Sequence, residues 1–143
     1  MNVRGIRNKN PMNVVKGSNW RGLRPIQTDG KFCQFTDMKW GLRAGIYILR
    51  RYVQTYHLNT IGRMILRWAP PSDGNLTPIY IKRVMDAVKV ATGTESYQFD
   101  EEDFLLDDDK ASPALVAMVK TICLIESGYR VSEKEIIEAI KLL

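Results

Sequence analysis

Beyond residue 36, apolar residues recur at three- and four-residue spacing, which is the period of an amphipathic helix. The first stripe consists of Leu42, Ile46, Leu49, Val53 and Tyr56. Asp37 precedes this stripe and has a side chain suited to an N-cap. A shorter helix is predicted over 61–68, and it must stop before Pro70-Pro71 because a residue that precedes proline disfavours helical backbone.

Start and stop signals predict three more helices. Each begins at a residue that can cap a helix, and the first two end at a glycine. The signals are Thr77-Pro78 with Gly93, Ser112-Pro113 with Gly128, and the capping box of Ser132 with Glu135.

Residues 1–36 have a different pattern, rich in Gly, Asn and Pro, with apolar pieces too short for helices. They predict loops and a small β-hairpin or ribbon. The expected fold is therefore α+β and mainly helical. The length of 143 residues suits a single domain, with a loop and ribbon part (1–36) and a helical part (37–143).

Charge is unevenly distributed along the chain. Residues 1–94 carry 16 Lys and Arg against 4 Asp and Glu, whereas residues 95–143 carry 5 against 12. A basic region suits an anionic polymer, either nucleic acid or a bacterial wall; the alternative is that the acidic part packs against it. No apolar stretch reaches the ~20 residues of a membrane span, and the polar N-terminus lacks the apolar region of a signal peptide.

The sequence favours neither a metal site nor a disulfide framework. Cys33 and Cys123 are too few and too widely spaced, and His57 is the single histidine. Both cysteines are expected to be small core residues, and no cofactor is expected.

The segment KTICLIESGYR (120–130) ends an apolar run on Glu126. In a last helical turn, the free carbonyls and the negative end of the helix dipole disfavour a carboxylate, and burial would raise its pKa further. An acid that stays protonated is what cleavage of a glycosidic bond requires. The alternative is a solvated residue at a helix end.

The stretches RGIRNKNPMNVVKGSNWRGL, DGKFCQF, GLRAGIYIL, RWAPPSDGNLTPIYIKRV and LIESG resemble a family of phage and prophage virion proteins, described as structural proteins. The resemblance covers nearly the whole chain, and RWAPP is its most specific motif. The chain departs from the family pattern at Lys9 (usually Asn), Met12 (usually Gly) and Ser127 (often Asn). Because glycine allows positive φ, Met12 is expected to alter the turn at 10–13.

The order of motifs is also similar to that of a circularly permuted lytic transglycosylase or goose-type lysozyme. An Asn-Pro turn and a ribbon come first, then Tyr80, and only afterwards Glu126-Ser127. Permutation is feasible where the original termini lie close together. This resemblance implies a lysozyme-like domain with glycoside hydrolase or transglycosylase activity on peptidoglycan. Such a protein would reside in the virion, or in the bacterial cytoplasm before release, and act at the cell wall.

The resemblance also implies roles for individual side chains. Glu126 would be the general acid, and Tyr80 would hold Glu126 or a sugar. The residues expected to bind the substrate are Asn10, Asn13, Trp20, Tyr80 and Ser127. The alternatives are turn formation for the two asparagines and core packing for the tryptophan and tyrosine.

A second carboxylate is less evident. Asp29 is the first candidate and Asp73 the second, although Asp29-Gly30 also suits a turn. Transglycosylases as a class manage with one Glu by using the N-acetyl and hydroxyl groups of the substrate.

Three functions remain in competition. The first is a phage-derived, peptidoglycan-cleaving enzyme of the transglycosylase or muramidase type, whose partner is the glycan strand. The second is a non-catalytic virion structural or wall-binding module that contacts other virion proteins. Nucleic-acid binding is the third, and it is disfavoured because the basic residues are scattered and no recognition motif is present.

Overall fold

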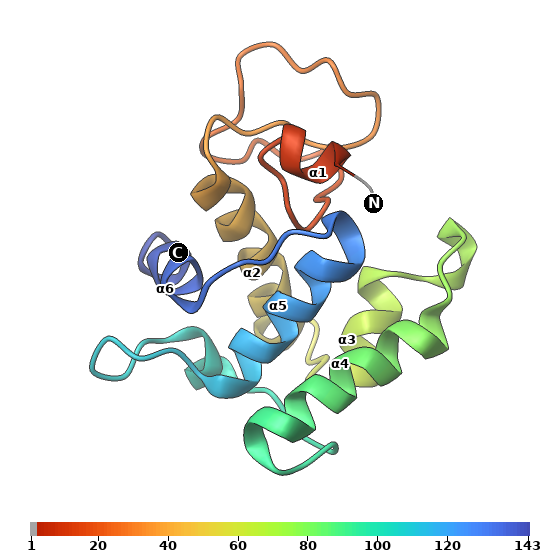
Figure 1. Ribbon diagram of the computed structural model, residues 1–143, viewed down its shortest axis with the longest axis vertical. Helices are drawn as coiled ribbons and strands as arrows, with labels where there is room; N and C mark the ends of the chain where they lie inside the picture. Colours follow the sequence, from red (N-terminus) through yellow and green to blue (C-terminus); the bar gives the residue numbers. More distant parts are fainter. Residues whose placement is uncertain (1–2) are drawn as a thin grey trace.

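The computed structural model describes residues 3–143, and helices dominate it (Figure 1). The α-helices are α1 (Arg4–Arg7), α2 (Met38–Gln54), α3 (Ile61–Trp68), α4 (Thr77–Thr92), α5 (Pro113–Ser127) and α6 (Glu133–Lys141). Two short 3₁₀ helices, η1 (Pro71–Asp73) and η2 (Glu101–Phe104), lie in the connections. No helix within 3–143 has both the length and the apolarity to cross a membrane.

The polar side chains at the helix starts confirm most of the predicted boundaries. Asp37 accepts a hydrogen bond from the main-chain N–H of Lys39, and Ser112 accepts one from that of Leu115. The capping box of α6 is present, and Gly128 ends α5 in the left-handed conformation.

The predicted cap at Thr77 is wrong. Thr77 is the first residue of α4, and its hydroxyl donates a 2.6 Å hydrogen bond to the carbonyl of Ala69. This bond ties the start of α4 to the end of α3 across the connection that contains Pro70-Pro71.

The core is organised around α5, which crosses the middle of the molecule (Figure 1). It packs along α4, while α2 packs against α6 and α3 against α4. The fully buried side chains of α5 include Leu115, Met118, Val119, Ile122 and Cys123. Cys33 and Cys123 are both buried free thiols, which confirms their prediction as core residues.

The predicted N-terminal β-hairpin is absent, so the α+β assignment, and with it the lysozyme-like fold class, is wrong. Residues 4–7 form the short helix α1 instead. Among residues 3–143 only isolated β-bridges occur, and in the N-terminal part they pair Val15 with Phe32 and Leu23 with Phe35. The chain from α1 to α2, which contains these bridges, is a long loop (Figure 1).

Side-chain amides explain why no strand ladder forms here. Gln27 donates to the carbonyls of Arg24 and Gln34 and accepts from the main-chain N–H of Gln34. Asn10 bonds the main chain of Val14 in the same way. Because these groups satisfy the backbone locally, extended pairing gains nothing there.

Candidate functional site

Glu126 lies in the last turn of α5 and meets side chains from two distant segments. The Tyr80 hydroxyl, on α4, donates to its Oε2 at 3.0 Å. Asn13 Nδ2 donates to its Oε1 at 3.2 Å and to its main-chain carbonyl at 3.0 Å. The structure thus brings together three of the side chains that sequence analysis selects, although they lie up to 113 positions apart.

The environment of Glu126 raises the pKa of its carboxyl group. Burial is the largest cause, and hydrogen bonding from Tyr80, Asn13 and Trp68 opposes it. The pKa of the Tyr80 hydroxyl is also raised, by burial first and then by the nearby Glu126. Both shifts have the same origin, because charge is disfavoured at this half-buried position.

Glu126 lines a cavity of about 290 Å³. The other walls come from the turn after Asn13, from α2, and from the end of α3 with the following connection. Trp68, Pro70 and Asp73 belong to the last of these walls. Asp73, the second candidate for a partner carboxylate, therefore lies at the same cavity as the acid.

Trp68 lines the cavity beside Glu126, although the sequence does not indicate it as a site residue. The RWAPP motif is the signal that could have located Trp68, because its prolines end α3 and make Trp68 the last residue of the helix. Arg67 of the same motif also lines the cavity.

Asn10 and Ser127 hold the site together from within. Asn10 is fully buried, and its amide donates to the carbonyls of Val14 and Cys33 at 2.9 Å each. Ser127, also fully buried, donates to the Pro11 carbonyl at 2.8 Å. Their side chains therefore face the protein and connect the Asn-Pro turn to the end of α5.

A close backbone approach completes this connection. Gly5 of α1 lies against the end of α5, and a Cβ atom added there would lie 2.7 Å from the Ser127 Cβ. Figure 1 shows α1 beside that end of α5. Only glycine fits this contact.

Met12 does not strain the turn as the sequence suggests. Positive φ occurs at Lys9 (54°) and Asn13 (55°), on either side of it. Met12 is fully buried, and a Cβ added at Gly45 of α2 would lie 2.3 Å from its sulfur. Of the residues that depart from the family pattern, Lys9 is the one with a left-handed backbone conformation. Asparagine adopts that conformation more readily than lysine does.

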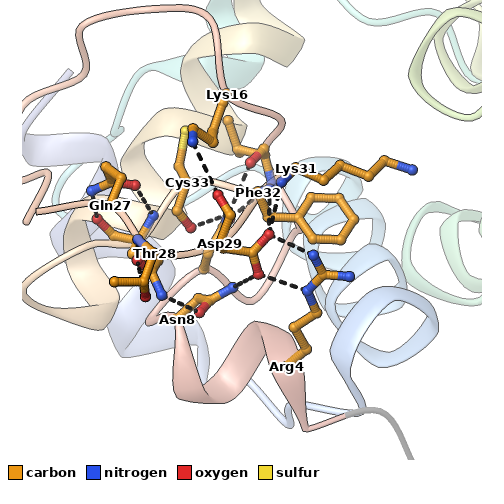
Figure 2. A network of polar contacts seen from close by, with 12 residues as sticks. Arg4, Asn8, Lys16, Gln27, Thr28, Asp29, Lys31, Phe32 and Cys33 are labelled. Carbon is orange, nitrogen blue, oxygen red and sulfur yellow. Dashed lines mark hydrogen bonds and ion pairs between the residues drawn. The ribbon is translucent and has the colours of Figure 1, made fainter.

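Asp29 is engaged elsewhere, in the network that Figure 2 shows. It pairs with Arg4 through both carboxylate oxygens and accepts from the main-chain N–H groups of Lys31 and Phe32 and from the Asn8 amide. The Arg4 guanidinium is the largest cause that lowers the pKa of Asp29 far below its usual range. Asp29 does not line the cavity at Glu126.

Trp20 lies at a larger neighbouring cavity of about 680 Å³. Its ring meets Tyr47 edge to face, with 5.4 Å between centroids. Val15, Ile48, Tyr52 and Arg67 line both cavities, so the two adjoin along α2 and α3. Trp20 is therefore next to the acid's cavity and not in it.

No protein-family model matches the sequence. Over 86 residues the chain is 41% identical to Protein P5 of Pseudoalteromonas phage PM2. The aligned region makes up 57% of this chain and 53% of that protein. The chain thus spans about half the length of the curated relative it matches. The similarity relates it to a phage protein.

Proposed function

We propose that this protein cleaves the glycan strands of bacterial peptidoglycan, with Glu126 as the general acid. The observation that carries the proposal is the raised pKa of a carboxyl group that lines a cavity and is held by Tyr80 and Asn13. Such a group keeps its proton at a pH where an ordinary glutamate has lost it. The similarity to a phage protein is compatible with an activity directed at the wall of a bacterial host.

The chemistry requires one proton transfer. Neutral Glu126 donates its proton to the glycosidic oxygen as the C1–O bond breaks, and the bonding pair leaves with that oxygen. A hydroxyl of the same sugar or a water then adds to C1, and the Glu126 carboxylate recovers the proton that this nucleophile loses. Hydrogen bonds from Tyr80 and Asn13 fix the carboxyl orientation and stabilise the ionised form between the two transfers.

A single acid suffices for capture by the sugar's own hydroxyl. Asp29 is held by Arg4, which leaves Asp73 as the other carboxylate near the acid. We expect the one-acid route, so Asp73→Asn should retain activity within about threefold, and the products should end in 1,6-anhydro sugars. Loss of activity on this substitution, with reducing-end products, would indicate hydrolysis with Asp73 as base.

A zymogram on purified peptidoglycan tests the assignment of Glu126. Wild type should clear the substrate, and Glu126→Gln should lower the rate by about 10²-fold or more. Glu133→Gln, an exposed glutamate at the start of α6, is the matched control and should clear normally. Clearing that survives Glu126→Gln would refute the assignment.

The second candidate is a non-catalytic virion or wall-binding module. It is favoured by the similarity to a phage protein and by the engagement of Asp29 in an ion pair, which leaves no ready dyad. This function predicts no clearing by wild type, together with retention on peptidoglycan that Glu126→Gln leaves unchanged.

A further inference from the structure

The larger cavity forms a cationic groove that leads to Glu126. Its cations are Lys16, Arg21, Arg43, Arg51 and Arg67, and no acidic residue lines it. The four ion pairs found within residues 3–143 lie elsewhere. Positive charge is therefore concentrated here without an internal counter-charge.

The guanidinium groups are held in place by aromatic rings. Arg67 lies over Tyr56, with 4.0 Å from its Cζ to the ring centroid, and also over Tyr52 at 5.5 Å. Arg51 lies over Tyr56 at 6.0 Å. Arg67 also donates a hydrogen bond to the Tyr52 hydroxyl, and the fork geometry of the remaining guanidinium N–H donors matches a carboxylate.

Crowding of charge is also visible at Arg43 in the same groove. Burial, followed by the neighbouring Arg21 and Arg50 charges, lowers the pKa of Arg43 although Tyr47 opposes this. An anion that entered the groove would relieve the repulsion, since none of these cations takes part in the ion pairs found within residues 3–143.

We propose that this groove binds the peptide-stem carboxylates of a peptidoglycan strand, which distinguish it from a neutral glycan. The inference rests on the proposed function and specifies which part of the substrate the chain recognises. Because Tyr52 and Arg67 line both cavities, carboxylates held along α2 and α3 place the adjoining glycosidic bond beside Glu126.

A polynucleotide suits the groove less well. Single strands bind through base stacking on open aromatic faces. Here Tyr47, Tyr52 and Tyr56 each have a guanidinium over the ring, which occupies surface that bases would use.

The test measures retention on two insoluble glycans, with Glu126→Gln present throughout so that neither is degraded. Peptidoglycan sacculi carry the carboxylates, whereas chitin has the same N-acetylglucosamine units without them. Arg51→Gln with Arg67→Gln should lower affinity for sacculi at least about tenfold and for chitin less than twofold. The matched control, Arg83→Gln with Arg130→Gln, removes two exposed charges outside the groove and should change neither by more than twofold.

Arg51→Lys with Arg67→Lys keeps the charge without the guanidinium fork and should restore part of the affinity for sacculi, which separates charge loss from damage to the fold. Equal losses in the control and groove variants would overturn the proposal. So would retention of single-stranded DNA that depends on Arg51 and Arg67 while retention of sacculi does not. Failure of the proposed function has a different signature, since wild type would then bind sacculi through the groove without clearing them.

Discussion

Two carboxylates near the N-terminal turns have opposite environments. Asp29 faces the Arg4 guanidinium and several N–H donors, and its pKa is lowered. Glu126 is half-buried at a helix C-terminus with the neutral donors of Tyr80, Asn13 and Trp68, and its pKa is raised. The comparison shows why sequence position alone does not identify an acid: the same functional group supports the fold in one place and can carry a transferable proton in the other.

The two isosteric amides should affect stability in opposite directions. Asp29→Asn should lower the free energy of unfolding by about 2 kcal/mol, because the charge-assisted bonds are lost and an amide N–H₂ faces donors. Glu126→Gln should leave it unchanged or raise it by up to about 1 kcal/mol, because a disfavoured charge is removed. Urea denaturation at pH 7 measures both, and a large loss for Glu126→Gln would identify Glu126 as a structural partner.

The pH dependence of stability follows from the same pKa directions. Asp29, with a lowered pKa in the folded state, stabilises the fold above its unfolded pKa of about 4, and this contribution is lost as pH falls further. Glu126, with a raised pKa, costs stability as pH rises above about 4. The advantage of Glu126→Gln over wild type should therefore vanish in acid.

Asn13 tests how the turn holds the acid. Asn13→Ala removes two hydrogen bonds and puts alanine, which adopts positive φ less readily than asparagine, at φ 55°. The free energy of unfolding should therefore fall by about 2 kcal/mol. Asn13→Gly removes the same bonds without backbone strain and should lose about 1 kcal/mol. Equal losses would show that backbone strain contributes nothing at this position.

Tyr80→Phe should change the pH profile of glycan cleavage. The Tyr80 hydrogen bond lowers the pKa of Glu126, so its removal raises that pKa and extends the protonated form to higher pH. The basic limb of the pH–rate profile should move upward, while Tyr129→Phe, whose hydroxyl bonds Glu135, serves as control. If the basic limb does not move, the Tyr80 hydrogen bond does not influence the pKa of Glu126.

Lys9→Asn should have the smallest effect. Lys9 has φ 54°, a conformation that asparagine tolerates better, so the substitution should raise the free energy of unfolding by about 0.5 kcal/mol. Thermal melting beside the exposed control Lys120→Asn measures it, and a lower melting temperature for Lys9→Asn than for wild type would contradict the strain argument.

The helical part was predictable because its signals are local. Asp37, Ser112 and the Ser132–Glu135 pair each act within one helical turn, so the sequence reveals them. The cap at Thr77 failed because its hydroxyl bonds Ala69, eight residues away, which no local pattern indicates.

The N-terminal part and half of the site depend on long-range contacts. The absence of the hairpin reflects side-chain amides such as Asn10, which bonds Cys33 across 23 residues. The pairing of Arg4 with Asp29 spans 25 residues. Sequence reasoning could select Glu126, Tyr80 and Asn13 as candidates through resemblance, but it could not tell that Asp29 was already paired or that Trp68 stood at the cavity.

The contact between Gly5 and Ser127 has a consequence for biosynthesis. The turn that orients Glu126 leaves the ribosome before the end of α5, which emerges more than a hundred residues later. The contacts of Glu126 with the Asn-Pro turn therefore cannot form until translation has passed α5, so the order of synthesis delays assembly of the proposed proton donor.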